Sequence, residues 1–334
     1  MFLGTLMEYM TTKTAVVIPN WNGQDVIARC IDSLLVQTIK PTIVVVENGS
    51  VDSSDAILAV YGKKIVVLKQ PKNLGFAGGV NVGIRYAIDN GFDYVALFNN
   101  DAVADKRWLE ELVNGMSDKT VAITTPKMLK ADKITLDAVG TEYSIYGAPF
   151  PRGRNEIDTG QYDTPAEVFG GAGGASLYRT ELLKEIGLFD EDFFAYYEED
   201  DINFRARLKG WRVMTAPKAV VYHDIGGTSG KIKGFTVQQT AQNFWFLYTK
   251  NMPGWLFYKY LPLASLWYFL MFVDRTRKGA FIYFIKGWFG SIGLFAKTIA
   301  KRRSIQENRT ITPKQASEFL YHAMPPKSLR SNKS

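Results

Sequence analysis

The chain has 334 residues, of which 46% are hydrophobic and 22% are charged, with 13 prolines and 29 glycines. This composition excludes a disordered, collagen-like or heptad-repeat protein. The length predicts one large α/β domain with additions, or two domains. The single cysteine, Cys30, excludes an intrachain disulfide and a multi-thiolate zinc site, which is typical of a protein in a reducing compartment.

The positive charge is concentrated in the last quarter of the chain. Residues 244–334 contain 15 Lys and Arg against three acidic residues, a net charge of +12, whereas the first 243 residues carry −5. The same quarter is rich in aromatic residues, but its longest uncharged run, residues 260–273, has only 14 residues. About 18 to 20 are needed to span a bilayer, so we expect this region to lie on an anionic membrane surface. The alternative is a helical hairpin that packs on the core or on another subunit of a homo-oligomer, with the basic residues facing solvent. Nucleic acid is not an expected partner, because no nucleic-acid-binding motif accompanies the basic residues.

Residues 1–12 read as a leader or loose end, and from residue 13 apolar runs alternate with helical patterns. The sequence predicts strands at 14–18, 42–46, 65–68 and 94–98. Between and after them it predicts helices at 25–36, 53–61 and 107–116, and a glycine-rich entry at 75–79 that leads into a helix ending near residue 89. The strands are apolar without alternation, so helices should cover both faces of the sheet. This predicts an α/β fold with a Rossmann-like, mixed but mostly parallel sheet flanked by helices.

The second half of this region is less regular. We expect a flap or hairpin excursion at 127–167, then a loop and strand at 169–178 in which the glycines of 170–174 let the backbone approach a neighbour closely. A helix follows at 198–209, and two short strands at 212–215 and 220–223 end the globular part near residue 234.

Polar residues follow four of the predicted strands. They are Asn20-Trp-Asn22, Glu47-Asn48, Asn73 to Phe76, and Asn99-Asn-Asp101. In parallel sheets ligands bind at the carboxyl ends of strands, so we expect these residues to converge on one crevice. The glycines at 75, 78 and 79 lack dinucleotide-fingerprint spacing; they favour either a helix N-terminus facing a phosphate or sugar, or a close helix–sheet approach.

Two further groups are candidates for chemistry. Asp101 and His223 both end predicted strands and would suit a divalent ion bridging a diphosphate, although Asp101 also fits a plain turn and His223 a structural histidine. Four acids, Glu198-Glu-Asp-Asp201, open a predicted helix. They would complement its dipole, but residues 100° apart cannot all face solvent, so one or two should point inward as a candidate general base.

Five segments, in order, resemble the motifs of the family 2 inverting glycosyltransferases, with the rhamnosyltransferase-like enzymes as the nearest branch and galactofuranosyltransferases as relatives. The segments are Thr14-Ala-Val-Val-Ile-Pro-Asn-Trp-Asn22, Val44-Val-Val-Glu-Asn-Gly-Ser-Val-Asp-Ser53, Asn73-Leu-Gly-Phe-Ala-Gly-Gly-Val-Asn81, Leu97-Phe-Asn-Asn-Asp101 and the run from Phe193 to Arg205. The resemblance covers residues 14–227 and implies a GT-A fold, a catalytic domain at 13–234, a dTDP- or UDP-linked sugar donor and a Mg or Mn ion.

The resemblance also implies roles for single residues. The donor-binding set would be Pro19, Asn20, Asn22, Glu47, Asn48, Asp52, Asn73, Gly75, Phe76, Asn81 and Asn100. Asp101 matches the family's metal-binding acid and His223 a later metal-ligand histidine. Glu199 falls where the family has its catalytic aspartate, with Glu198 ahead of it and Asp200 as a further alternative. This chain departs from the pattern in having Asn99 for the first acid of the metal motif, and glutamate for aspartate at 47 and 199.

The function that the resemblance implies is transfer of a sugar, with inversion, to a hydroxyl of a glycan or polyprenyl-linked glycan in cell-surface polysaccharide synthesis. A rhamnose-like 6-deoxyhexose is favoured; galactofuranose, glucose and N-acetylhexosamine remain alternatives. We expect a cytoplasmic enzyme held peripherally on the inner face of the cell membrane by residues 235–334. The alternative from a different class is a non-catalytic membrane-bound scaffold.

Overall fold

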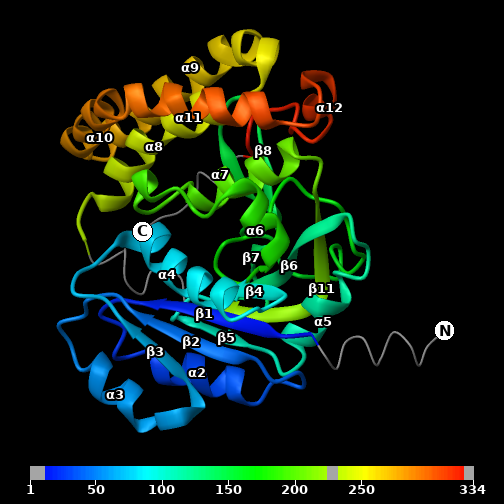
Figure 1. Ribbon diagram of the computed structural model, residues 1–334. Coiled ribbons are helices and arrows are strands. Elements are labelled where there is room, and N and C mark those ends of the chain that lie inside the picture. The colour runs from blue at the N-terminus through cyan, green and yellow to red at the C-terminus, as the bar shows by residue number, and fades with distance from the viewer. Residues whose placement is uncertain (1–11, 224–231, 327–334) are drawn as a thin grey trace.

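A computed structural model describes residues 12–223 and 232–326 (Figure 1). Nearly all of the expected leader lies outside the described residues. In the described part, a nine-stranded sheet has the order β3-β2-β1-β4-β10-β6-β11-β5, with β7 beside β6. The strands are β1 (Thr14–Asn20), β2 (Thr42–Glu47), β3 (Val66–Lys69), β4 (Tyr94–Leu97), β5 (Ala102–Ala104), β6 (Val121–Lys130), β7 (Leu136–Ala138), β10 (Leu177–Arg179) and β11 (Arg212–His223). The strands β8 (Thr141–Tyr143) and β9 (Pro149–Pro151) pair separately.

The sheet is mixed but mostly parallel, which confirms the predicted fold class. The strands β1 to β4 pair in parallel, as do β6 and β11, whereas β10 runs antiparallel between β4 and β6, and β5 antiparallel to β11. The two short strands expected at the end are one strand, β11. Its register with β6 shifts between Ala216 and Val220, so a bulge replaces the expected break.

Helices cover both faces of the sheet because its strands are apolar on both sides. In β1, Val16 packs into a cluster with α2 (Ile27–Leu35), α3 (Ser54–Val60) and α5 (Trp108–Asn114). Its neighbour Val17 faces the opposite cluster, with α4 (Gly75–Asp89), α6 (Thr180–Ile186) and α7 (Glu198–Leu208). Of these helices only α6 has no counterpart in the sequence prediction.

The C-terminal region forms a helical layer above the sheet domain (Figure 1). It consists of α8 (Phe235–Asn251), α9 (Gly254–Arg277), α10 (Phe281–Gly293), α11 (Phe295–Asn308) and α12 (Pro313–Glu318). Phe204 of α7 and Phe169 lie in the same buried cluster as Phe244 of α8 and Leu256 of α9. The helical layer therefore shares a hydrophobic core with the helix that carries the four acids.

Helix α9 is longer than the sequence suggests. The 14-residue uncharged run lies inside a 24-residue helix whose most apolar window has a mean hydropathy of 1.3 and is 22% buried. By length and composition alone this helix could cross a membrane, so the uncharged run understates the length of the helix. Pro262 lies within the helix without ending it, and α8, α10 and α12 pack against it.

Candidate functional site

The ends of β1 and β2 are joined by a network of buried side chains. Asn20 and Glu47 are register partners, and Asn20 Nδ2 donates to Glu47 Oε2 at 2.7 Å. Asn100, which follows β4, donates from Nδ2 to Asn20 Oδ1 at 2.9 Å. The other Glu47 oxygen accepts the N–H of Ser50 at 2.8 Å. Three predicted donor-site residues from three strand ends thus meet in one place.

The loops after β1 and β2 are also held together. The N–H of Val51 donates to Asn22 Oδ1 at 2.9 Å, and the N–H of Gln24 donates to Asp52 Oδ2 at 3.0 Å. Asn22 has a φ of 50°, a left-handed conformation that asparagine tolerates better than most residues. The predicted residues Asn22 and Asp52 therefore shape adjoining loops at the same sheet edge.

The start of α4 is fixed to the same edge. Asn48 Nδ2 donates to Asn73 Oδ1 at 3.2 Å and to the Gly75 carbonyl at 3.0 Å, and Asn48 Oδ1 accepts the N–H of Leu74. A Cβ at Gly79 would lie 3.0 Å from Asn48 Nδ2 and 3.5 Å from Cβ of Pro19. The glycines thus allow a close helix–sheet approach, one of the two roles predicted for them. Phe76 is half-buried and packs with the core cluster beneath α4.

Asn81 is the one donor-site candidate that the structure places apart from this group. Its Nδ2 donates to the Phe189 carbonyl at 2.8 Å and to Glu191 Oε1 at 2.9 Å, and its Oδ1 accepts the Phe189 N–H at 3.0 Å. Both ends of this buried amide are therefore engaged in holding the segment before α7 against α4.

Asp101 and His223 meet because β5 pairs with β11. His223 is the register partner of Ala102, so Asp101 comes next to it, and Asp101 Oδ1 lies 3.2 Å from His223 Nε2. Asn99 Nδ2 lies 3.3 Å from the same ring nitrogen. Burial lowers the pKa of His223, but its hydrogen bonds to Asp101 and to Asp137 outweigh burial and raise the pKa to about 9.

Two residues near His223 were missed by the sequence analysis. Asp137, on β7, is buried, and its Oδ2 lies 2.9 Å from His223 Nδ1. Arg154 forms an ion pair with the other Asp137 oxygen at 3.2 Å. Burial raises the pKa of Asp137, but His223 and Arg154 hold it below its usual value. No local pattern marks either residue, and Asp137 reaches His223 only because β7 pairs with β6.

The donor atoms of Asp101 and His223 fit a divalent ion with two protein ligands. Neighbouring ligands of an octahedral ion bound at about 2.1 Å are about 3 Å apart, close to the 3.2 Å between Asp101 Oδ1 and His223 Nε2. A carboxylate on the far ring nitrogen, as Asp137 provides, is the usual support of a metal-binding histidine. Within the described residues no cluster of three or more His, Cys, Asp or Glu could hold a metal, so further ligands would come from the donor and water.

Three of the four acids opening α7 are buried. Burial, together with the neighbouring acids, raises the pKa of Glu198 and of Asp200, and Glu198 Oε2 and Asp200 Oδ1 find no hydrogen-bond partner among the described residues. Asp201 is different. Burial raises its pKa, but Lys250 and Arg205 hold the pKa below its usual value through ion pairs of 2.8 Å each. Asp201 is therefore a structural acid, and more of the acids point inward than the expected one or two.

Glu199 is half-buried and lies against residues 170–174, which we call the glycine loop. A Cβ at Gly173 would be 2.3 Å from Glu199 Oε2, and one at Gly174 would be 2.8 Å from Asn99 Nδ2. Two adjacent glycines thus separate the Glu199 carboxylate from the Asn99, His223 and Asp101 group. Burial raises the pKa of Glu199 to about 7, while a hydrogen bond from the Gly173 N–H and the charges of Arg154 and His223 lower it in part.

The fold resembles that of solved glycosyltransferases. The structure of S. aureus TarS 1-349 matches with a TM-score of 0.52 and 16% identity over 92% of this chain and 83% of that one. GalNAc-T7 with UDP, GalNAc and Mn2+ matches with a TM-score of 0.53 and 16% identity over 72% of this chain and 50% of that one.

Curated relatives are glycosyltransferases that differ in their sugars. Galactofuranosyltransferase GlfT1 of Mycobacterium tuberculosis is 29% identical over 66% of this chain and 73% of its own length. The dTDP-rhamnosyl transferase RfbF of Shigella flexneri is 24% identical over 52% and 57%. The pre-mycofactocin glycosyltransferase of M. tuberculosis is 28% identical over 63% of this chain. The chain spans 42% of this last relative's length and 57% of RfbF.

The match to a family profile covers the part of the chain that builds the strand-end site. Glycosyl transferase family 2 matches residues 15–187, more than half of the chain. These residues include β1 to β6 with their polar ends, Asp101, Asp137, Arg154 and the glycine loop. The chain therefore belongs to glycosyl transferase family 2.

Proposed function

We propose that this protein is an inverting hexosyltransferase. It moves a sugar from a dTDP- or UDP-linked donor to a hydroxyl of a glycan or polyprenyl-linked glycan in cell-surface polysaccharide synthesis. The observation that carries the proposal is the position of Glu199. It is a half-buried acid with a pKa raised to about 7, and Gly173 and Gly174 lie between its carboxylate and the group formed by Asn99, Asp101 and His223.

In this proposal Glu199 is the general base. A base whose pKa lies near the working pH accepts a proton from the acceptor hydroxyl most effectively. The oxygen of that hydroxyl forms the new bond to the anomeric carbon as the bond to the nucleotide diphosphate breaks on the opposite face, so the configuration inverts. Glu198 and Asp200 are weaker candidates, because burial and neighbouring acids favour their neutral forms.

The strand-end network would hold the nucleotide donor. Asn20, Glu47 and Asn100 form a buried base at the strand ends. The N–H groups of Leu74, Gly75 and Ala77 at the start of α4 already donate to Asn48, Asn73 and Phe194, so they fix this segment beside the sheet. The network would give a preorganised surface for the nucleotide. Asn81 would act indirectly, by holding the segment before α7 against α4.

Asp101 and His223 would hold a Mg or Mn ion. When bound, the ion would neutralise charge on the leaving diphosphate. Asn99 stands where the family motif has its first acid, so the two ligands supplied by this chain make the expected affinity for the ion modest.

A rhamnose-like 6-deoxyhexose is the sugar we favour. The similarity to the dTDP-rhamnosyl transferase RfbF supports this choice, whereas the similarity to GlfT1 supports galactofuranose. Glucose and N-acetylhexosamine are further alternatives, and the assay includes their nucleotide sugars. The test incubates the full chain with each nucleotide sugar, with and without Mg or Mn, and measures nucleotide release. The same assay with Glu199→Gln, and with exposed Glu318→Gln as the matched control, separates an enzyme from a non-catalytic scaffold, for which neither change would matter.

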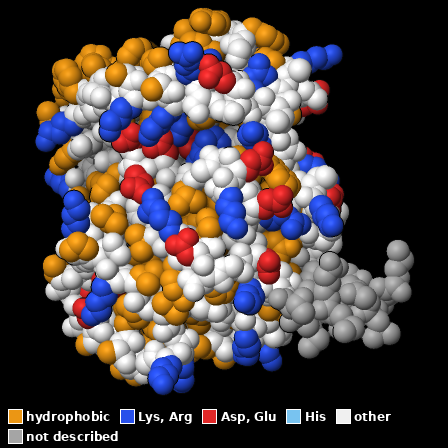
Figure 2. All heavy atoms as spheres, viewed as in Figure 1, with side chains coloured by type: hydrophobic (Ala, Val, Ile, Leu, Met, Phe, Trp, Pro, Cys, Tyr) orange, Lys and Arg blue, Asp and Glu red, His pale blue; other side chains and the backbone are white. Residues whose placement is uncertain are grey.

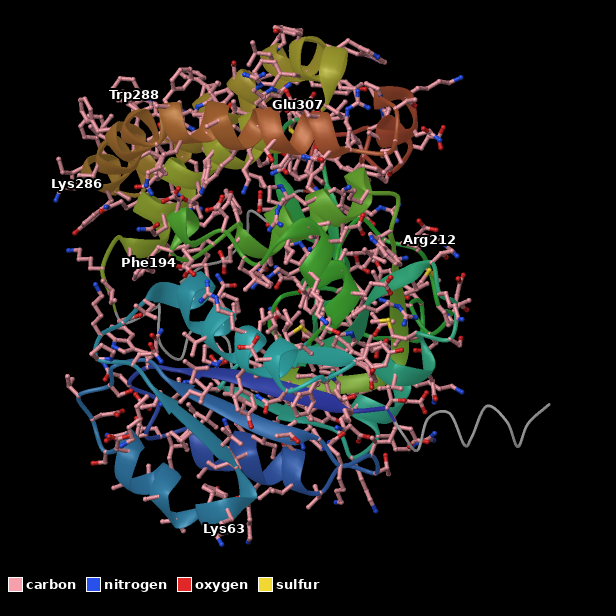
Figure 3. All side chains as sticks on the ribbon, viewed as in Figure 1. Lys63, Phe194, Arg212, Lys286, Trp288 and Glu307 are labelled. Carbon is pink, nitrogen blue, oxygen red and sulfur yellow. The ribbon has the colours of Figure 1, made fainter. Side chains whose placement is uncertain are left out.

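The helical layer would rest on the inner face of the cell membrane. Large apolar side chains stay exposed on α9 to α11, as along the upper edge in Figure 2. They include Trp255, Tyr258, Phe269, Phe281, Ile282, Trp288, Phe289, Ile292 and Phe295. Figure 3 shows Lys286 and Trp288 on the outer side of α10, the mixture of cations and aromatic rings that suits anionic head groups.

Vesicle flotation tests this contact. Replacing Phe269, Trp288 and Phe289 by serine should remove binding to phosphatidylserine-containing vesicles, because each loses apolar area that the lipid would bury. Val60→Ser, at an 85% exposed position on α3, is the control and should bind as wild type. Unchanged flotation of the triple variant would reject the contact, and a change in sedimentation mass instead would indicate a homo-oligomer interface.

A further inference from the structure

The segment that leads into α7 has an unusual backbone. Phe194, Tyr196 and Tyr197 have φ angles of 61°, 67° and 73°, although none of them is glycine. Side chains with a Cβ are strained in this region, and three such residues within four positions persist only where surrounding contacts impose them. We call residues 194–197 the left-handed turn.

The left-handed turn connects the two halves of the proposed site. The N–H of Ala77, in the first turn of α4, donates to the Phe194 carbonyl at 3.2 Å, and a Cβ at Gly75 would lie 2.4 Å from that oxygen. Figure 3 shows Phe194 between α4 and the helical layer. At its other end, Tyr197 directly precedes α7 and therefore Glu199. Movement of the turn would change the position of Glu199 relative to the donor side.

Helix α8 of the helical layer holds the turn through two polar residues: the hydroxyls of Thr236 and Tyr196 lie 2.8 Å apart, and Asn243 makes several hydrogen bonds. Asn243 of α8 is fully buried, and its Nδ2 donates to the carbonyl oxygens of Phe193 at 3.0 Å, Ala195 at 2.9 Å and Tyr196 at 2.8 Å. Its Oδ1 has no hydrogen-bond partner among the described residues. The amide therefore donates only to the turn and to Phe193, which directly precedes it, while its acceptor stays unsatisfied.

Helix α8 also holds α7 one turn further along. Lys250 Nζ lies 2.8 Å from Asp201 Oδ1, and Asn251 Nδ2 donates to the same oxygen at 2.8 Å. Asp201 is fully buried, so these contacts fix the first turn of α7 against α8. The turn and the acids that follow it are thus attached to α8 at both ends.

We propose that Asn243 is a positioning residue for the transfer reaction, and that α8 is part of the catalytic unit. By binding the carbonyl groups of Phe193, Ala195 and Tyr196 it keeps the left-handed turn in its strained form, and so sets the distance of Glu199 from the donor side. This inference rests on the proposed function. It moves the boundary of the catalytic unit beyond residue 234, into the region that we also expect to contact the membrane.

Asn243→Ala tests the proposal, with Tyr248→Phe as its matched control. Tyr248 is also buried on α8, and its hydroxyl donates to the Phe257 carbonyl at 2.6 Å, so the control loses a buried hydrogen bond that does not touch the turn. We expect kcat of Asn243→Ala to fall tenfold or more, since a misplacement of about 1 Å can cost about 100-fold. The dissociation constant for the nucleotide should stay within about threefold, because Asn48 and Asn73 hold the start of α4 independently.

Amide hydrogen exchange gives a readout that does not need the reaction. Exchange in residues 194–199 should become at least tenfold faster in Asn243→Ala and stay unchanged in Tyr248→Phe. Asn243→Ser keeps one hydrogen-bond donor and takes the place of the alanine variant if that variant does not fold. Exchange in residues 194–199 should then be faster than in wild type. Unchanged exchange in the turn, or an equal loss of kcat in the control, would overturn the proposal. Faster exchange in a protein without transferase activity would support the positioning and reject the proposed function instead.

Discussion

Gly173→Ala perturbs the proposed base without altering the base itself. The added Cβ would lie 2.3 Å from Glu199 Oε2, 2.9 Å from its Cδ and 3.0 Å from its Cβ. Gly173 is not among the glycines with positive φ, so its backbone accepts alanine. The clash therefore falls on the Glu199 side chain, whose carboxylate is the flexible end.

The structure gives the size of the displacement. Ordinary van der Waals contact begins at 3.4 Å, so the carboxylate must move by about 1 Å and would lose its hydrogen bond from the Gly173 N–H. A shift of about 1 Å in a reacting group costs about 100-fold in rate. Because a rotating carboxylate can relieve the clash, we expect the free energy of unfolding to fall by only about 1 kcal/mol.

The assay measures kcat and the melting temperature of the same preparations. Gly293→Ala is the control, because a Cβ there meets nothing within 4 Å and the backbone φ is not positive. We expect kcat to fall about 100-fold in Gly173→Ala and to be unchanged in Gly293→Ala, with both proteins folded. Turnover of Gly173→Ala within threefold of wild type would refute the assignment of Glu199 as the base.

Four further predictions follow from the charges around the site. The pKa of Glu199 is raised to about 7, so kcat/KM should increase with pH and level off above about pH 7; a flat profile between pH 5.5 and 8 would contradict this. The same shift makes the contribution of Glu199 to folding stability greatest below its unfolded pKa and lost as the pH rises through about 7, which urea unfolding at pH 5 and 8 can measure. Lys250→Met removes a buried cation from Asp201 and Asp190, which keep only Arg205 and Lys301 as partners, so urea unfolding should show a loss of about 3 kcal/mol, and a loss under 1 kcal/mol would contradict the ion-pair role. Asp101→Ala should abolish the effect of Mg or Mn on nucleotide affinity in titration calorimetry; an unchanged metal effect would place the ion elsewhere.

Much of the sheet domain could be predicted from sequence, because its signals are local. Helix α4 ends at Asp89, as predicted, and begins at Gly75, at the start of the glycine-rich entry expected at 75–79. The strand ends could be assigned to one edge because parallel strands point the same way. Strand β11 was predicted as two pieces, because Pro217 and Lys218 interrupt its apolar pattern while the backbone continues through a bulge.

The rest of the site depends on contacts between distant parts of the chain. Asp137 reaches His223 across 86 residues, and only the pairing of β7 with β6 brings them together. Asn243 reaches the left-handed turn from a region whose composition indicated membrane, core or subunit contact but no link to the catalytic acids. Helix α9 was underestimated because charged residues at its ends interrupt the apolar run without interrupting the helix. In each case the decisive interaction has no periodic or local signature.

The most direct test of the central claim is the turnover of Glu199→Gln, with nucleotide affinity measured on the same sample. Glutamine keeps the size of the side chain but cannot accept the proton from the acceptor. The account predicts that kcat falls about 100-fold or more while the dissociation constant for the nucleotide stays near the wild-type value. A variant that turns over at close to the wild-type rate would show that another group accepts the proton.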